Sequence, residues 1–292
     1  RLLDGRDFKD KVDILVGGSP CQSFSTVGFQ GGLEDTRGTL FYDYANLIKD
    51  VNPKVFIYEN VRGLTTHDKG KTWAIMKNVF DELGYQIYED VLDAKEYGIP
   101  QTRRRVYVVG IREDITGHDL LHFPPDQKQL NYTMQDFLLS SCEEGGFSYD
   151  NDGNITLSKV PGIYDKKYIL SPKLERYVMK TGTKTFVQKV AIDLPVARTI
   201  LSTMGNRHRA GVDNYISTDT GLKDEQTIEL YGTNRREYIR MLTEREAHRL
   251  MGFTDDYKIV VSRAQGYKQA GNSIVVDVLI EILKNIIELN IL

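Results

Sequence analysis

Apolar runs and helical stretches alternate in the first part of this chain. Short apolar runs occupy residues 12–16, 55–58 and 106–111, and stretches with helical spacing, residues 41–50 and 72–83, lie between them. Short apolar runs are typical of buried strands, and their alternation with helices predicts βαβ units and a mostly parallel sheet. We therefore predict an α/β domain in this part of the chain.

The pattern changes from His118 to about Tyr231. Here short runs are separated by polar loops, such as residues 143–146 and 150–154. Such a pattern predicts a second, smaller domain that is mainly β or irregular.

Helical spacing returns near the C-terminus, in residues 243–251 and 274–289. Thr243 followed by Glu246 is the capping-box pattern that opens a helix. We therefore predict that the first domain is interrupted by the second. The predicted boundaries are residues 1–115 and 241–292 for the first domain, and 116–240 for the inserted one.

The composition is that of an ordinary globular protein, with 40% hydrophobic and 27% charged residues among 292. No stretch approaches the roughly 18 apolar residues of a membrane-spanning helix, so we predict no membrane partner. Cys21 and Cys142 are the two cysteines, which argues against a disulfide framework and for a reducing compartment, the cytoplasm. The net charge of −3 gives no sign of nucleic-acid binding.

A candidate nucleophile follows the first predicted strand. Residues 17–25 read Gly-Gly-Ser-Pro-Cys-Gln-Ser-Phe-Ser, so Cys21 stands at the carboxyl end of a buried strand, where open α/β sheets carry their sites. The alternative for a lone cysteine is a small buried hydrophobic side chain. The paired glycines and Pro20 permit a sharp turn, which favours a reactive thiol.

A carboxylate and a run of arginines would lie near this thiol if the predicted third strand is antiparallel to the first two. Glu59 follows the second strand, and Arg103, Arg104 and Arg105 precede the third. An antiparallel third strand would bring all of them to one edge of the sheet. Arginines favour the thiolate, and a carboxylate can bond to a ring nitrogen, so the set suits covalent attack on an electron-poor ring. The alternatives are a surface carboxylate and a solvated basic face.

Five motifs in the order and spacing found here resemble the DNA cytosine-5 methyltransferases of bacterial restriction–modification systems. They are residues 17–25, 59–61, 101–105, 242–253 and 269–274. The resemblance implies a Rossmann-like sheet of the kind that binds S-adenosylmethionine, a smaller target-recognition domain, and methyl transfer to C5 of a cytosine flipped out of duplex DNA. It also implies a bacterial, nucleoid-associated enzyme without a metal ion.

The resemblance implies roles for individual residues. Cys21 adds to C6 of the base, Glu59 contacts N3 and the exocyclic amine, and Arg105, helped by Arg103, holds the base oxygen. The residues implied at the cofactor are Pro20, Leu40, Asn272 and Ile274. Those implied at the DNA are Gln22, Ser25 and Arg37, in a lid loop, and Arg198 and Thr199, in a segment that packs the two domains together.

A basic loop in the middle domain is a further candidate for DNA contact. Residues 181–215 carry five basic side chains against two carboxylates. Arg207 and Arg209 lie between Gly205 and Gly211, as in a loop that enters a DNA groove. The alternative is a solvated hairpin.

One expected motif is absent before Cys21. The family normally begins with a strand and a glycine-rich loop for the methionine end of the cofactor, and only 20 residues precede Cys21. We therefore expect N-terminal strands to be missing, an N-terminal fragment or partner subunit to supply them, and little cofactor affinity in the isolated chain. The alternatives for function are a tRNA cytosine-5 methyltransferase, a split-enzyme subunit, and a catalytically silent DNA-binding subunit.

Overall fold

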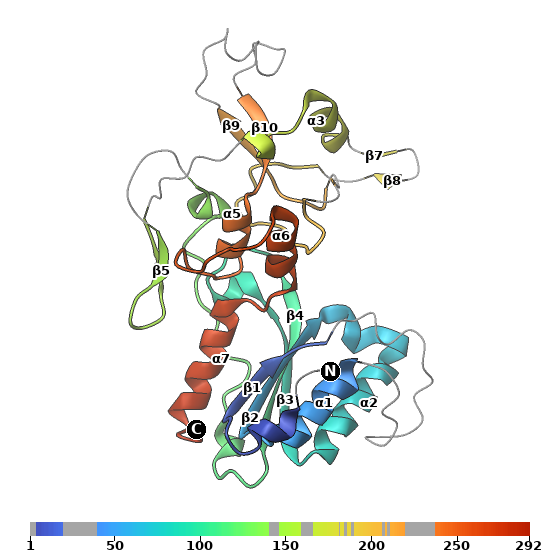
Figure 1. Cartoon of the computed structure of the whole chain (residues 1–292), viewed down its shortest axis with the longest axis vertical. Coiled ribbons are helices and arrows are strands. Elements are labelled where there is room, and N and C mark those ends of the chain that lie inside the picture. The colour runs from blue at the N-terminus through green and yellow to red at the C-terminus, as the bar shows by residue number, and fades with distance from the viewer. Residues whose placement is uncertain are drawn as a thin grey trace. The chain divides into compact units, whose positions relative to one another are not determined.

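The structure is a computed structural model, and it describes most of the chain. The described residues are 4–19, 40–139, 146–158, 166–180, 182–183, 186–187, 190–205, 208, 211–219 and 237–292. The chain divides into two compact units (Figure 1). The first comprises Arg1–Asp93, Arg104–Gln127 and Val278–Leu292, and the second comprises Ala94–Arg103 and Lys128–Asp277.

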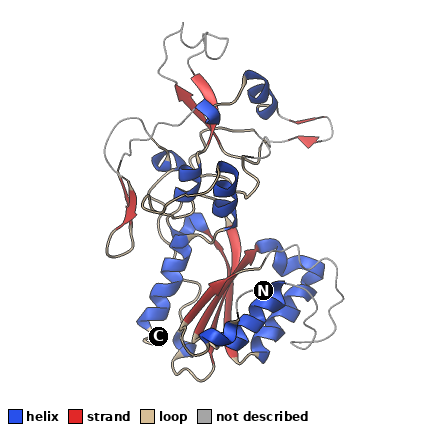
Figure 2. Ribbon diagram, in the orientation of Figure 1, coloured by secondary structure: helices blue, strands red, loops and turns tan. Residues whose placement is uncertain are grey.

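The first unit is built on a four-stranded sheet with the order β1-β2-β4-β3. Its strands are β1 (Ile14–Gly17), β2 (Val55–Val61), β3 (Tyr85–Asp93) and β4 (Arg104–Arg112). Helices α1 (Leu40–Val51) and α2 (Lys71–Glu82) lie on one side of this sheet, and α7 (Val276–Glu288) is drawn on the other (Figures 1 and 2). The prediction of an α/β chain is therefore confirmed.

An aromatic core joins α1 and α2 to the sheet. The ring of Phe80 lies 5.4 Å from Phe41 and 4.9 Å from Phe56, centroid to centroid. Phe56 and Tyr58 alternate with Val55 and Ile57, so that one face of β2 meets the two helices. All four of these β2 side chains are fully buried, which explains the continuous apolar run in the sequence.

Two features of the sheet differ from the prediction. Strand β3 was not predicted, because its run is broken by the exposed Glu89 and Asp90. The sheet is also not mostly parallel: β1 pairs with β2 in parallel, whereas β4 is antiparallel to both β2 and β3. Residues 94–103 connect β3 to β4 without the crossover helix that a parallel neighbour requires.

The second unit consists of short ribbons and short helices. Its antiparallel pairs are β5 (Phe147–Tyr149) with β6 (Ile155–Leu157), β7 (Gly182–Thr183) with β8 (Phe186–Val187), and β9 (Tyr215–Asp219) with β10 (Glu237–Met241). Its helices are α3 (Pro172–Val178), α5 (Glu244–Arg249) and α6 (Arg263–Asn272). The 3₁₀ turns among the described residues of both units are η1 (Gly5–Phe8), η3 (Arg62–Gly70), η4 (Ala94–Tyr97), η5 (His118–Leu120), η6 (Met134–Phe137) and η7 (Lys166–Tyr168).

Residues 241–277 belong to the second unit, although the sequence assigned them to the first domain. The reason is a buried ion pair across this stretch: both Nη atoms of Arg240 on β10 donate to the carboxylate of Glu246 on α5, at 2.8 and 2.9 Å. The predicted capping box of α5 is confirmed. Glu246 accepts from Thr243 N at 2.7 Å, and its own N–H donates to Thr243 Oγ1 at 3.1 Å.

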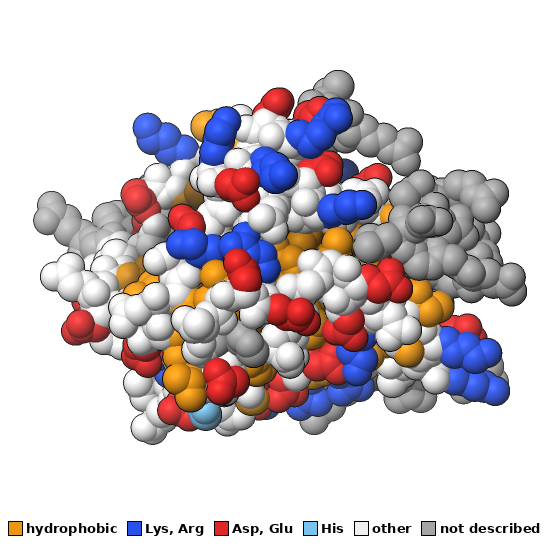
Figure 3. Space-filling model, turned by 90° about the horizontal axis from the view of Figure 1, so that it is seen from below, with side chains coloured by type: hydrophobic (Ala, Val, Ile, Leu, Met, Phe, Trp, Pro, Cys, Tyr) orange, Lys and Arg blue, Asp and Glu red, His pale blue; other side chains and the backbone are white. Residues whose placement is uncertain are grey.

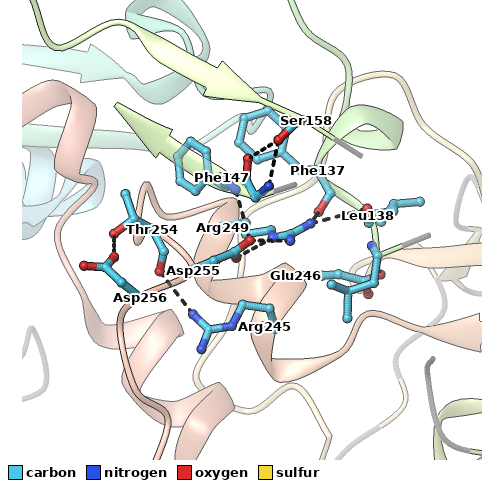
Figure 4. A network of polar contacts seen from close by, with 12 residues as sticks. Phe137, Leu138, Phe147, Ser158, Arg245, Glu246, Arg249, Thr254, Asp255 and Asp256 are labelled. Atoms are coloured by element: carbon cyan, nitrogen blue, oxygen red, sulfur yellow. Dashed lines mark hydrogen bonds and ion pairs between the residues drawn. The ribbon is translucent and has the colours of Figure 1, made fainter. Parts of the chain in front are cut away.

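A second buried arginine organises the same unit (Figure 4). Arg249 donates from Nε and Nη2 to the two carboxylate oxygens of Asp255, at 2.8 and 2.6 Å. Its Nη1 donates to the carbonyl of Phe137 at 3.1 Å, and Phe147 N donates to Asp255 at 3.0 Å. One guanidinium and one carboxylate thus tie α5 to the η6 turn and to β5.

Two kinds of feature are absent from the described residues. No helix among them is long and apolar enough to cross a membrane. Within the same residues, no group of three or more His, Cys, Asp and Glu side chains could hold a metal ion.

Candidate active site

Glu59 and Arg105 meet at one edge of the first unit's sheet. Strand β4 is antiparallel to β2, in the register Val61↔Arg105, so the start of β4 lies beside the end of β2. The direction that the sequence argument required is thereby confirmed. Arg105 Nε lies 3.2 Å from Glu59 Oε1, and both side chains are largely buried, at 15% and 12% exposure. Charges so shielded from water interact strongly.

The end of β1 lies against the same carboxylate. Gly17 pairs with Tyr58 in parallel register, and Gly18 follows it. A Cβ on Gly18 would stand 2.4 Å from the carbonyl oxygen of Glu59 and 3.6 Å from its Oε2. Glycine is required at this position because any side chain would collide with the Glu59 backbone.

A buried polar cluster holds the next residue along the chain. We call Ser19, Tyr58 and Asn60 the Tyr58 cluster. Asn60 Nδ2 donates to the carbonyl of Ser19 and to the phenolic oxygen of Tyr58, both at 2.7 Å. The Tyr58 hydroxyl and Ser19 Oγ are also 2.7 Å apart. Burial raises the pKa of Tyr58 to about 12, so its hydroxyl stays neutral and can donate.

The Tyr58 cluster was not predicted from the sequence as part of the candidate active site. The available signal was the spacing of Tyr58 and Asn60, two residues apart, because such residues share one face of a strand. The partner, Ser19, comes from a different strand end, and only the parallel register of β1 and β2 brings it there.

Several predicted residues lie outside the described part of the chain. They are Pro20, Cys21, Gln22, Ser25, Arg37, Arg207 and Arg209. The predicted cofactor residues Leu40, Asn272 and Ile274 are described. Leu40 begins α1 and is 48% exposed, Asn272 ends α6 with an exposed side chain, and Ile274 is half-buried.

Arg103 has different surroundings from Arg105. It belongs to the second unit and is buried, with 3% exposure. Nη1 donates to the carbonyl of Ile200 at 3.0 Å, and Nη2 donates to the carbonyls of Gly271 and Ser273, at 3.1 and 2.8 Å. Arg103 therefore holds both peptide carbonyls that flank Asn272.

The predicted DNA-contacting residues Arg198 and Thr199 also make bonds within the second unit. Arg198 Nη1 donates to the carbonyls of Ala191 and Asp213, at 3.1 and 3.2 Å, and burial lowers the pKa of its guanidinium. Thr199 Oγ1 donates to the carbonyl of Thr102 at 2.7 Å. The Thr199 bond connects the residue 198–200 segment to the residue 101–103 segment of the same unit, whereas the Arg198 bonds connect it to residues 191 and 213.

The chain belongs to the family described as C-5 cytosine-specific DNA methylase, which matches residues 1–288. It is 35% identical over 294 residues to the type II methyltransferase M.SsoII of Shigella sonnei, covering 98% of this chain and 66% of that protein. It is 34% identical over 279 residues to the type II methyltransferase M.HhaI of Haemophilus parahaemolyticus, covering 94% of this chain and 75% of that one. The chain thus spans about two thirds to three quarters of these relatives.

A solved structure has the same fold at low identity. The crystal structure of the S. pombe Dnmt2 methyltransferase matches with a TM-score of 0.62 and 18% identity, over 98% of this chain and 80% of that one. The family model and the two relatives confirm the family resemblance drawn from the five sequence motifs.

Proposed function

We propose that this chain transfers a methyl group from S-adenosylmethionine to C5 of a cytosine within a specific sequence of duplex DNA. The single observation that carries the proposal is the Glu59–Arg105 pair at the edge of the sheet where β1 leads towards Cys21. The sheet of the first unit would then be part of the Rossmann-like sheet of S-adenosylmethionine-dependent methyltransferases.

The proposed reaction has three stages in which these residues take part. The Cys21 thiolate attacks C6 of a cytosine that has left the base stack, and the new S–C6 bond makes C5 a nucleophile. As the S–C6 bond forms, N3 receives a proton through Glu59, and the Glu59 carboxylate then accepts bonds from N3–H and the exocyclic amine, so that negative charge does not accumulate on the ring. After methylation a base removes the C5 proton, and the electron pair left there expels the Cys21 thiolate and restores the ring. The N3 proton returns to Glu59 when the ring is restored.

The geometry of Glu59 supports this role. Arg105 holds Oε1, and Oε2 lies on the side of the Gly18 backbone, which continues towards Cys21. The pair is mostly shielded from water, so a bond from the carboxylate to a protonated ring nitrogen would be stronger than one made in water. Arg105 would in addition donate to the base oxygen, since a guanidinium has five N–H groups.

The cofactor residues are supported by their own surroundings. Leu40 offers exposed apolar surface at the start of α1. Asn272 is exposed, and Arg103 fixes the backbone carbonyls on both sides of it. When bound, S-adenosylmethionine would supply the methyl group. Pro20 and Ile274 are proposed as further apolar contacts of the cofactor.

The experiment is transfer of labelled methyl from S-adenosylmethionine to unmethylated duplex DNA by the protein that contains these residues. Cys21→Ser should abolish transfer, and Glu59→Gln should lower it by about 10²–10⁴-fold, the contribution of a positioned acid or base. Glu113→Gln is the matched control, because Glu113 is exposed and follows β4 at the opposite edge of the sheet.

The proposal also predicts the substrate. Duplex DNA should accept the methyl group and tRNA should not, and bisulfite sequencing should locate the product at one recognition sequence. Equal transfer by wild type and Glu59→Gln would contradict the proposed site, and transfer to tRNA alone would contradict the proposed substrate.

A further inference from the structure

Helix α3 and its flanks hold an unusual density of positive charge. On the face drawn in Figure 3, Lys and Arg side chains are interspersed with Asp and Glu side chains, as the net charge of −3 suggests. Residues 166–180 differ, with five basic residues against the single carboxylate Glu175. None of these residues was among those predicted to contact DNA.

The fold presents part of this charge as a stripe. We call Lys173, Arg176 and Lys180 the α3 stripe; they are three and four residues apart and all exposed. Lys173 and Arg176, three residues apart within α3, lie on one face of the helix, and Lys180 follows two residues after its last residue, Val178. Val178 is fully buried, so the helix face opposite Lys173 and Arg176 packs against the interior of the unit.

Local bonds hold the helix in this orientation. Ser171 caps its start, where Leu174 N donates to Ser171 Oγ at 3.3 Å. At its end, Met179 N donates to the carbonyl of Glu175 at 2.9 Å, and Lys180 N donates to that of Tyr177 at 3.3 Å. These bonds close the C-terminal end of α3, and Lys180 follows directly after it.

Tyr177 adds a polar aromatic group to the same face. Its side chain is 56% exposed, and it stands four residues after Lys173. A tyrosine hydroxyl between lysine and arginine side chains is a common donor to phosphate oxygens.

We infer that the α3 stripe contacts the sugar-phosphate backbone of the DNA substrate, an inference that rests on the proposed function. Lys173 and Arg176 are about 4.5 Å apart along the helix, at ~1.5 Å per residue, and Lys180 follows two residues after the helix ends at Val178. One strand of B-DNA presents a charge about every 3.4 Å of axis, so the spacing of Lys173 and Arg176 is close to that of neighbouring phosphates. Charges of both signs are typical of solvent-exposed helix faces, whereas the α3 stripe carries positive charge alone.

The test is a salt titration of DNA binding by the triple variant Lys173→Gln, Arg176→Gln, Lys180→Gln. Glutamine keeps the helix propensity of the basic residues it replaces. The matched control removes the same charge from exposed lysines of the first unit, in the triple variant Lys9→Gln, Lys11→Gln, Lys49→Gln. Fluorescence anisotropy gives Kd for a cognate and a non-cognate duplex between about 50 and 200 mM salt.

The α3 triple variant should reduce the slope of log K against log salt by about 0.9 for each phosphate that it no longer neutralises, up to about 2.7. The weakening should be equal on the two duplexes, because phosphate contacts carry no sequence information. The control triple variant should retain the wild-type slope. Circular dichroism of each variant verifies that the fold is kept.

An α3 slope that matches the control triple variant would overturn the inference, as would weakening restricted to the cognate duplex. The methyl-transfer assay on the wild type separates this outcome from failure of the proposed function. Wild-type transfer with an unchanged α3 slope counts against the stripe alone. Absent transfer with a reduced slope counts against the proposed activity and leaves the phosphate contacts intact.

Discussion

Replacing Tyr58 by Phe tests how the segment before Cys21 is held. The change removes only the phenolic oxygen, since the ring can keep its contacts with Phe41 and Phe80, whose centroids are 6.1 and 5.7 Å away. Two hydrogen bonds of 2.7 Å disappear, one with Ser19 Oγ and one from Asn60 Nδ2.

The two lost hydrogen bonds determine how far the free energy of unfolding should fall. A neutral hydrogen bond contributes about 0.5–1.5 kcal/mol net, so Tyr58→Phe should lower the free energy of unfolding by about 1–3 kcal/mol. Ser19 is two residues before Cys21, and a loosened Ser19 should misplace the thiol. We expect kcat for methyl transfer to fall about tenfold, the effect of ~1.4 kcal/mol in the barrier. KM for DNA should be unchanged, because Tyr58 is fully buried.

The fluorescence of Trp73 can measure the unfolding of the first unit. Trp73 is the only tryptophan of the chain and packs in the same apolar cluster as Tyr58, so its fluorescence during urea unfolding reports on the first unit. Ser19→Ala and the double variant with Tyr58→Phe give the coupling energy of their hydrogen bond, expected at about 0.5–1.5 kcal/mol.

Tyr44→Phe is the matched control for this prediction. The hydroxyl of Tyr44 is also buried and donates to the carbonyl of Ile57 at 3.1 Å. Its removal should lower stability and leave kcat at the wild-type value. If Tyr58→Phe behaves in the same way, the Tyr58 cluster is only structural and the reasoning is refuted.

Two predictions concern the buried ion pairs of the second unit. Arg240→Met should cost about 3–5 kcal/mol because it leaves the fully buried Glu246 without its cation; hydrogen exchange of the β10 amides measures it, and adding Glu246→Gln should recover part of the loss. Burial opposes ionisation of Asp255, but bonds from Arg249 and Phe147 N outweigh it and lower the pKa of that carboxyl below 3.8. The pair therefore stabilises the fold above the unfolded pKa, and this stability is lost as pH falls through the folded value. Asp255→Asn should flatten the acid limb of thermal stability between about pH 5 and pH 2, and an unchanged limb would contradict this assignment.

The order of helices and strands could be read from the sequence where the local signal is strong. The apolar runs before Cys21 and Glu59 form β1 and β2, and the predicted capping box opens α5. Strand β3 was not predicted because its exposed positions carry charge. The sequence also left open whether β4 is parallel or antiparallel to its neighbours. Strand direction depends on how a connection returns to the sheet, which no local pattern records.

The sequence itself determined that Glu59 stands near the end of one strand and Arg105 near the start of another. Each motif directly adjoins a strand, and the ends of neighbouring strands coincide once their directions are known. Such placement is a local property, because the hydrophobic run and the polar residue that ends it are adjacent in the chain.

Only the tertiary structure decided what the neighbouring side chains do. Arg103 and Arg105 are two residues apart in one basic run, yet Arg105 pairs with Glu59 and Arg103 donates to carbonyls 97 to 170 residues away. Ser19 and Tyr58 are likewise brought together from separate strands. A buried polar group must find a partner wherever the folded chain supplies one, and that partner is set by packing between distant segments, which the order of residues alone does not specify.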